Sequence, residues 1–189
     1  MDESRSRSTT SAAVTTPKLA PLLSYLDGLT GPMDLSVVER MLGELDIARG
    51  DVASSCVFGT KGYKRNTISR GEWHELVCIC WRSGHCTPIH DHRASSCGFK
   101  VIEGVGTEIR FEQSSSGLIC PVKTTRMEPG YVCVAEDADI HQIANMQSAG
   151  LDLVTLHLYS PPLCRINTWK YAEATVEACE QDGAAPLYD

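Results

Sequence analysis

The sequence predicts a mainly β protein, folded as a β-barrel or a jelly-roll sandwich and preceded by helices. Short apolar or alternating runs follow one another between glycines, which is typical of strands. Helical spacing is largely confined to the segments before them. Many short strands after a pair of helices indicate a barrel or sandwich. We expect strands at residues 75–81, 89–92, 97–102, 107–112, 131–135, 141–145 and 151–159.

Two amphipathic helices are expected before the first strand. The first should end near Gly31 and Pro32, and its apolar positions are Leu19, Leu22, Leu23 and Leu26. The second is predicted from Ser36, which Glu39 follows at the spacing of a capping box. Its apolar face carries Val38, Met41, Leu42 and Leu45.

The length and composition fit one globular domain. The chain has 189 residues, of which 42% are hydrophobic. Residues 1–16 are rich in Ser and Thr and lack periodicity, so we expect a disordered tail followed by a single domain over 17–189. The run WKYAEATVEACEQDG near the C-terminus has some helical periodicity.

The charge pattern indicates a small-molecule partner. The formal net charge is −7, and Lys and Arg form no stripe, which argues against nucleic acid or an anionic membrane as partner. No stretch approaches the roughly 20 apolar residues that a membrane helix needs. We therefore expect a cytoplasmic monomer that binds neither nucleic acid nor membrane.

The nine cysteines favour free thiols over a disulfide framework, because their number is odd and no secretory signal precedes them. Cys78, Cys80 and Cys133 lie in apolar strand patterns, where an unpaired cysteine behaves as a small hydrophobic residue. The absence of a CxxC pair weakens the case for a structural zinc site.

A pair of histidines dominates the glycine-framed stretch from Gly84 to Gly104. His90 and His92 are two positions apart in a predicted strand, where alternate side chains share a face. Both imidazoles could therefore hold one metal ion, with His141 as the next candidate ligand. Three histidines without a carboxylate form the predicted metal site.

The last predicted strand has two different faces. Val154, Leu156 and Leu158 make one face apolar, whereas the other carries Thr155, His157 and Tyr159. The second face could meet water, as in many antiparallel sheets, or it could line a cavity. Ser160-Pro161-Pro162 ends the strand abruptly.

The spacing of these residues resembles the motifs of the cupin superfamily. The first motif is matched by Gly84, His90, His92, Cys97 and Gly104, with Cys97 in place of the usual glutamate. The second is matched by Gly130, His141 and Asn145, although Glu136 and Ala138 replace its Pro and Gly. The resemblance implies a cupin jelly-roll barrel with N-terminal helices.

Further matches make the chain similar to the thiol dioxygenases, and to the cysteine dioxygenases in particular, from the first helix to about Asn167. They comprise Tyr63-Lys64-Arg65-Asn66, Cys80-Trp81 ahead of Gly84-His85, His90-Asp91-His92, Cys97 with Lys100, His141 with Asn145, and Leu156-His157-Leu158-Tyr159-Ser160-Pro161-Pro162. Agreement at so many separated points is not expected by chance.

The resemblance implies roles for individual residues. His90, His92 and His141 match the ligands of Fe(II). Arg65 matches the residue that pairs with the substrate carboxylate, and Tyr63 accompanies it. The catalytic group comprises Tyr159, which reaches the substrate and oxygen site, His157, which hydrogen-bonds it, and Cys97, which is cross-linked to the tyrosine ring by a thioether. The bond between Ser160 and Pro161 matches one that is cis.

The implied activity is Fe(II)-dependent oxidation of L-cysteine by O2 to cysteine sulfinate, a step of cysteine catabolism and taurine biosynthesis. One alternative is a 3-mercaptopropionate dioxygenase, but that group generally has Gln where Arg65 stands, so Arg65 and Cys97 favour cysteine. Another is a non-catalytic cupin that binds a metal or small ligand. Such a module has no evident need of His157 and Tyr159 beside the metal.

Overall fold

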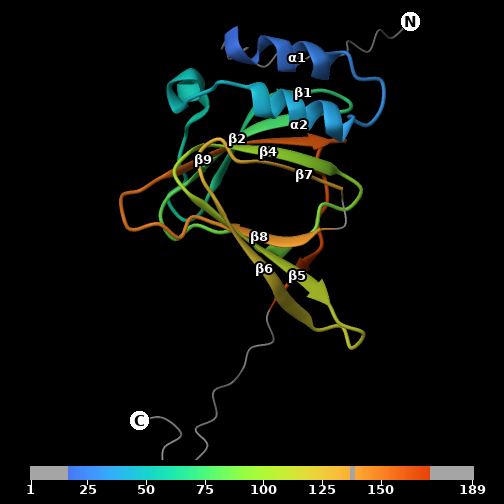
Figure 1. The fold of residues 1–189 in the computed structure, drawn as a ribbon, viewed down its shortest axis with the longest axis vertical. Coiled ribbons are helices and arrows are strands. Elements are labelled where there is room, and N and C mark those ends of the chain that lie inside the picture. Colours follow the sequence, from blue (N-terminus) through green and yellow to red (C-terminus); the bar gives the residue numbers. More distant parts are fainter. Residues whose placement is uncertain (1–16, 137–138, 171–189) are drawn as a thin grey trace, which may run out of the picture.

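The computed structural model describes residues 17–136 and 139–170. Two five-stranded sheets lie over one another, and the helices cover the outer side of one sheet (Figure 1). The mainly β fold with N-terminal helices is therefore confirmed. The expected tail at 1–16 and most of the C-terminal run with helical periodicity lie outside the described residues.

The strand order brings together segments that are distant in the sequence. The helical segments are η1 (Pro17–Leu19), α1 (Ala20–Asp27), α2 (Leu35–Glu44) and η2 (Arg49–Ser55). The first sheet consists, in spatial order, of β1 (Lys64–Arg70), β2 (Glu75–Trp81), β9 (Leu153–Ser160), β4 (Ser96–Glu103) and β7 (Val132–Ala135). The second consists of β10 (Thr168–Trp169), β3 (Ile89–His90), β8 (Ile140–Ala144), β5 (Gly106–Gln113) and β6 (Ile119–Met127).

Some boundaries differ from the prediction. Strand β3 ends at His90, so the expectation that His92 shares its strand face is wrong. The chain turns directly afterwards, where Arg93 and Ala94 have φ angles of 36° and 69°. Strands β1, β6 and β10 were not predicted, because the first two are rich in polar residues and the last is very short. Their pairing partners, rather than local patterns, hold them in the sheets.

Helix α2 begins with a different cap from the predicted one. Asp34 is the N-cap residue, and its Oδ1 accepts hydrogen bonds from the backbone N–H groups of Ser36, at 2.8 Å, and Val37, at 3.3 Å. An aspartate at this position satisfies N–H groups that lack helical partners. The prediction of a cap at Ser36 is therefore wrong, whereas Val38 and Leu42 are buried on the predicted apolar face.

The first sheet separates two apolar layers. In β2, Leu76, Cys78 and Cys80 pack with the helices, whereas Val77, Ile79 and Trp81 pack in the layer that includes residues from the second sheet. All residues of β2 and β9 are buried, so the interpretation of the 151–159 face as water-exposed is wrong. The polar face of β9 instead points into the interior of the barrel.

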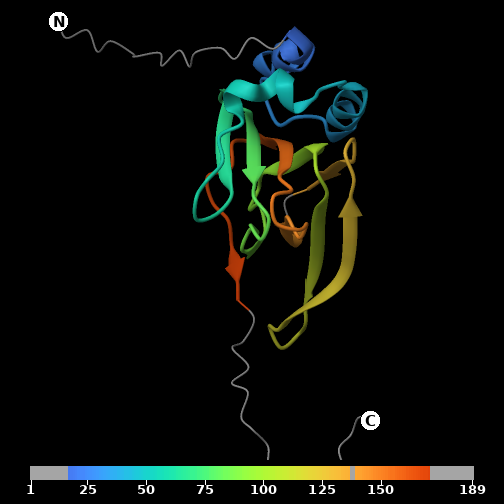
Figure 2. The ribbon, with the colours of Figure 1, turned by 90° about the vertical axis from the view of Figure 1, so that its left-hand side faces the viewer.

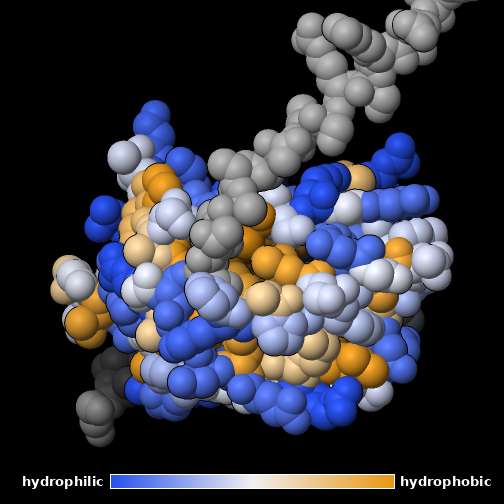
Figure 3. Space-filling model, turned by 90° about the horizontal axis from the view of Figure 1, so that it is seen from above, coloured by the Kyte–Doolittle hydropathy of each residue, from blue (hydrophilic) through white to orange (hydrophobic). Residues whose placement is uncertain are grey.

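The ends of the molecule differ in character. Viewed from the helical end, hydrophobic patches alternate with hydrophilic residues (Figure 3). The hairpin of β5 and β6 projects at the end opposite the helices (Figures 1 and 2). No helix in the part of the chain that the structure describes is long and apolar enough to span a membrane.

A buried lysine ties helix α2 to the first sheet. Lys100 of β4 donates hydrogen bonds from Nζ to the carbonyl oxygens of Leu42 and Leu45, both at 2.7 Å, and of Gly43 at 3.4 Å. Carbonyls at the C-terminal end of a helix lack helical partners and attract a cation. This contact explains Lys100 without a catalytic role.

We expect the substitution Lys100→Met to lower the free energy of unfolding by about 2 kcal/mol, because carbonyls at the end of α2 lose a charged donor. Urea unfolding followed by circular dichroism measures the loss. The matched control is Lys123→Met on the exposed surface of β6, which should change stability little. Equal stability of the two variants would contradict this account of Lys100.

Candidate active site

Three histidine rings meet between the sheets. His90 at the end of β3 pairs directly with His141 of β8, and His92 reaches the same place from the following turn. One ring nitrogen from each lies within 4.8 Å of the others, and Nε2 of His92 is 3.3 Å from Nε2 of His141. Two imidazoles bound at right angles to one ion have nitrogens about 3 Å apart. The spacing therefore suits a shared metal ion.

Hydrogen bonds orient two of these rings. Nδ1 of His90 lies 2.9 Å from the carbonyl oxygen of Pro88, and Nδ1 of His141 lies 3.0 Å from Oε1 of Glu108. Both oxygens accept, so each Nδ1 carries the proton and each Nε2 keeps a lone pair for a metal. The three rings fit a divalent cation.

The surroundings keep the imidazoles of His90 and His92 neutral. Burial disfavours the charged form of these imidazoles, and a positive charge on a neighbouring histidine would disfavour it further. Together these effects lower the pKa of His90 to about 4 and the pKa of His92 to about 3. Neutral imidazole is the form that binds metal. These rings are therefore ready to coordinate a cation at neutral pH.

Glu108 is a residue of the site that sequence reasoning missed. It is only 2% exposed, and besides His141 it contacts Arg110, whose Nε lies 3.2 Å from Glu108 Oε2. Burial raises the pKa of the Glu108 carboxyl, but His141 and Arg110 outweigh it and lower the pKa overall. In the sequence, Glu108 alternates with the apolar residues Ile109 and Phe111, so the pattern places its carboxylate on the polar face of the strand and does not indicate that it points inward. Only the pairing of β5 with β8 brings Glu108 beside His141.

A chain of hydrogen bonds crosses the polar face of β9. The Tyr159 hydroxyl lies 3.3 Å from Nδ1 of His157, whose Nε2 lies 3.0 Å from the Thr155 hydroxyl. The indole of Trp81 donates to the same Thr155 oxygen at 3.0 Å. The ring of Tyr159 also packs edge-on against His92, with centroids 5.5 Å apart. Tyr159 and His157 thus lie beside the three histidines.

Burial sets the protonation of this chain. Burial raises the pKa of the Tyr159 phenol, and the adjacent Cys97 adds to the effect, whereas Arg65 opposes it. Burial and the charge of Arg65 hold the pKa of His157 well below its ordinary value. At neutral pH the pair therefore consists of a protonated phenol and a neutral imidazole.

Arg65 of β1 faces the same place with a carboxylate already beside it. Its Nη1 lies 3.3 Å from the Tyr159 hydroxyl, and its guanidinium carbon lies 4.8 Å from the centre of the Tyr159 ring. Its Nη2 lies 3.3 Å from Oε2 of Glu75, whose other oxygen lies 3.0 Å from Nη1 of Arg70. Glu75 is a second residue that sequence reasoning missed. A substrate carboxylate that binds Arg65 has to share the guanidinium with Glu75.

Cys97 lies opposite Tyr159 on the neighbouring strand. Strands β4 and β9 pair with Cys97 directly across from Tyr159, and both residues are 3% exposed. Burial raises the pKa of the Cys97 thiol, and Cys133 adds to the rise. The thiol is protonated at neutral pH. The peptide bond between Ser160 and Pro161, at the end of β9, is cis, as the resemblance implied.

A cavity joins these groups to the surface. An inner cavity of about 20 Å³ is lined by Tyr63, Arg65, Ile79, Trp81, Thr87, His90, His92, His141, Ile143, His157 and Tyr159. An outer pocket of about 280 Å³ shares Tyr63, Arg65 and His90 with it and is also lined by residues 163–166. The ring of Tyr63 stacks on Trp81 with centroids 4.6 Å apart. Every predicted site residue except Cys97 lines the inner cavity.

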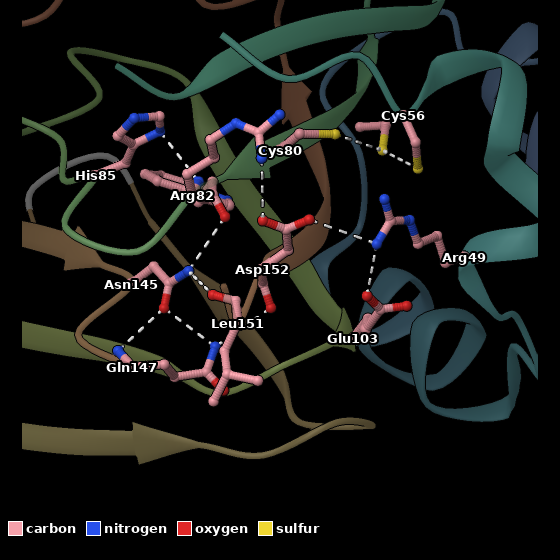
Figure 4. A network of polar contacts seen from close by, with 12 residues as sticks. Arg49, Cys56, Cys80, Arg82, His85, Glu103, Asn145, Gln147, Leu151 and Asp152 are labelled. Atoms are coloured by element: carbon pink, nitrogen blue, oxygen red, sulfur yellow. Dashed lines mark hydrogen bonds and ion pairs between the residues drawn. The ribbon is translucent and has the colours of Figure 1, made fainter. Parts of the chain in front are cut away.

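Asn145, which the second motif includes, has a structural position. It is fully buried, and its Nδ2 donates to the carbonyl oxygens of Trp81, at 3.1 Å, and Leu151, at 2.9 Å (Figure 4). Its Oδ1 accepts from the backbone N–H of Gln147 at 3.1 Å. Asn145 therefore joins the ends of β2, β8 and β9 rather than facing the cavity.

Comparison with protein families decides where the chain belongs. A model of the family described as cysteine dioxygenase type I matches residues 7–172. The chain belongs to this family. Membership supports a thiol dioxygenase, an oxidoreductase that acts on a small molecule with O2.

Individual relatives are similar over most of their length. Cysteine dioxygenase type 1 of Homo sapiens is 30% identical over 150 residues, which cover 76% of this chain and 74% of the human protein. The Rattus norvegicus enzyme of the same name is 29% identical with the same coverage. A solved structure of a Klebsiella pneumoniae protein with a double-stranded β-helix domain has a TM-score of 0.49 and 14% identity, and covers 63% of this chain and 94% of that chain.

Proposed function

We propose that this protein is an Fe(II)-dependent cysteine dioxygenase that oxidises L-cysteine with O2 to cysteine sulfinate. One observation carries the proposal: the Arg65 guanidinium and the imidazoles of His90, His92 and His141 line the same cavity. An anion-binding group beside a metal site suits a small thiol that also bears a carboxylate. Family membership supports the reaction class.

The three histidines are proposed to hold the iron. Three neutral ligands leave the double positive charge of Fe(II) uncompensated and leave coordination positions open. The bound iron supplies the redox-active centre at which the substrate thiolate and O2 meet. The contacts of Glu108 and of the Pro88 carbonyl with Nδ1 would leave Nε2 of His141 and of His90 free to bind the iron.

Arg65 and Tyr63 are proposed to bind the substrate carboxylate. A guanidinium presents paired N–H donors that match the two oxygens of a carboxylate. Arg65 is partly exposed where the inner cavity meets the outer pocket, so the substrate can reach it. Its ion pair with Glu75 keeps the guanidinium in place and competes with the substrate for it.

Tyr159 and His157 are proposed to act beside the sulfur atom of the bound substrate. The protonated phenol donates a hydrogen bond toward the reacting groups, while His157 and Thr155 fix its direction. We also propose a thioether between Cys97 Sγ and a ring carbon of Tyr159, supported by their direct pairing across β4 and β9. Forming this bond removes one hydrogen from each partner, and O2 takes up the two electrons and two protons.

Two alternatives remain distinguishable. A 3-mercaptopropionate dioxygenase would use the same histidines, but Arg65 stands where that group generally has Gln, which favours cysteine. A non-catalytic metal-binding cupin would need no phenol beside its metal. The buried Tyr159 and His157 therefore favour an enzyme.

We expect protein reconstituted with Fe(II) under anaerobic conditions to consume O2 once L-cysteine and air are added. Each O2 consumed should yield one cysteine sulfinate, because both oxygen atoms enter the sulfur. An oxygen electrode and mass spectrometry of the product measure the two amounts. Zn(II)-loaded protein is the control, since Zn(II) has no redox chemistry. If the protein turned over 3-mercaptopropionate faster than cysteine, a 3-mercaptopropionate dioxygenase would be favoured. If O2 uptake did not depend on iron, a non-catalytic metal-binding cupin would be favoured.

A further inference from the structure

Three cysteine sulfurs meet on the side of the first sheet that faces the helices. Cys78 and Cys80 alternate with Ile79 along β2, so both thiols point to this side while Ile79 lines the inner cavity. Cys56, which directly follows η2, brings the third thiol. Cys78 and Cys80 are fully buried, and Cys56 is half-buried. A strand therefore separates this cluster from the three histidines.

The sulfur spacing matches that of a thiolate metal site. Sγ of Cys78 lies 3.9 Å from Sγ of Cys56 and 3.9 Å from Sγ of Cys80, and all three lie within 4.8 Å of one another. Three sulfurs bound in a plane at about 2.3 Å from one ion are about 4 Å apart. A disulfide needs an S–S distance of about 2.05 Å, a much larger movement. Thiolates select soft metal ions.

We propose that Cys56, Cys78 and Cys80 form a second metal site, which takes a divalent thiophilic d10 cation such as Zn(II) through three sulfur atoms. It shares no ligand with the three-histidine site. The half-buried Cys56 gives the ion a way in from the surface.

Groups around the cluster suit negatively charged sulfur. Asn66 approaches Cys80, with Nδ2 3.6 Å from Sγ. Figure 4 shows Cys56 and Cys80 beside the Arg49 guanidinium, whose Nη1 lies 2.8 Å from Oε1 of Glu103. An N–H donor and a guanidinium therefore lie beside the sulfurs, where both favour negative charge.

Charge favours a divalent ion over a monovalent one. When an ion M²⁺ replaces the protons of three thiols, three H⁺ leave to solvent and the M(SR)₃ unit carries one negative charge. A monovalent ion would leave two negative charges in a largely buried place, where charge is costly to desolvate. No electron transfer is involved, so binding needs no oxidant or reductant.

Cd(II) is a suitable probe, because its thiolate complexes absorb in the ultraviolet whereas its histidine complexes do not. The full chain should be reduced and loaded with Fe(II) under anaerobic conditions, which occupies the histidine site. We expect thiolate-to-metal absorption that saturates at one Cd(II) per chain, with three protons released. X-ray absorption at the cadmium edge should show sulfur neighbours.

Two variants test the assignment independently. Cys56→Ser and Cys80→Ala should each weaken Cd(II) binding by on the order of 100-fold, as expected when a metal site loses an essential partner. Cys120→Ser, on the exposed part of β6, is the matched control and should bind as the wild type does. Thermal unfolding shows which variants are folded. Cd(II) affinity in one folded variant is enough to test the assignment. Absence of the absorption in the wild type, wild-type affinity in a folded variant, or weakened binding in the control would overturn the proposal.

Discussion

The substitution Arg65→Gln should raise KM for L-cysteine by about 100-fold. Removing one partner of a buried, hydrogen-bonded charge pair costs about 2 to 5 kcal/mol, and each 1.4 kcal/mol is tenfold in affinity. The amide of Gln keeps a donor but loses the positive charge and the paired geometry. Steady-state O2 consumption at varied cysteine concentration measures KM and kcat separately. An unchanged KM would show that Arg65 does not hold the carboxylate.

Glu75 offers the matched control for this experiment. Because Glu75 accepts a hydrogen bond from the Arg65 guanidinium, Glu75→Gln should weaken this competing ion pair and lower KM for cysteine. The double variant Arg65→Gln with Glu75→Gln removes any repulsion between an unpaired Glu75 and the substrate. If the double variant recovered wild-type KM, the loss in Arg65→Gln would reflect repulsion by Glu75 rather than a missing carboxylate contact.

The interior of the fold was predictable because its strands carry their pattern in the sequence. Strand β2 was expected with the bounds that the structure has, since its apolar run is continuous and flanked by turns. Strand β1 was not, because KRNTISR has neither an apolar run nor clear alternation. Its place in the sheet depends on pairing with β2, which no local pattern encodes.

The candidate site also contains residues that the sequence predicts and residues that it does not. Residues in motifs, such as His90 and Tyr159, could be found by spacing, and the structure brings them together in one cavity. Glu108 and Glu75 could not, since each becomes part of the site only through a residue on the neighbouring strand of its sheet. The thiol cluster is similar: a search for CxxC pairs missed Cys78 and Cys80, because in a strand two cysteines share a face at a spacing of two.

The substitution Glu108→Gln should weaken Fe(II) binding by about 10- to 100-fold, the usual effect of losing the carboxylate behind a metal-binding histidine. The amide can still accept from Nδ1 of His141, but it lacks the charge that makes the imidazole a stronger ligand and that pairs with Arg110. Iron affinity measured by competition with a chelator reports this directly, without depending on turnover.

Two further variants separate orientation from simple loss of charge. Glu112→Gln removes a carboxylate from the exposed end of the same strand and should leave iron affinity unchanged. Glu108→Asp keeps the charge but shortens the reach to His141, so it should bind iron less tightly than wild type and more tightly than Glu108→Gln. If Glu108→Gln held iron as tightly as wild type, the carboxylate would serve only to pair with Arg110. The orientation of His141 would then rest on the direct pairing of His90 with His141 across β3 and β8.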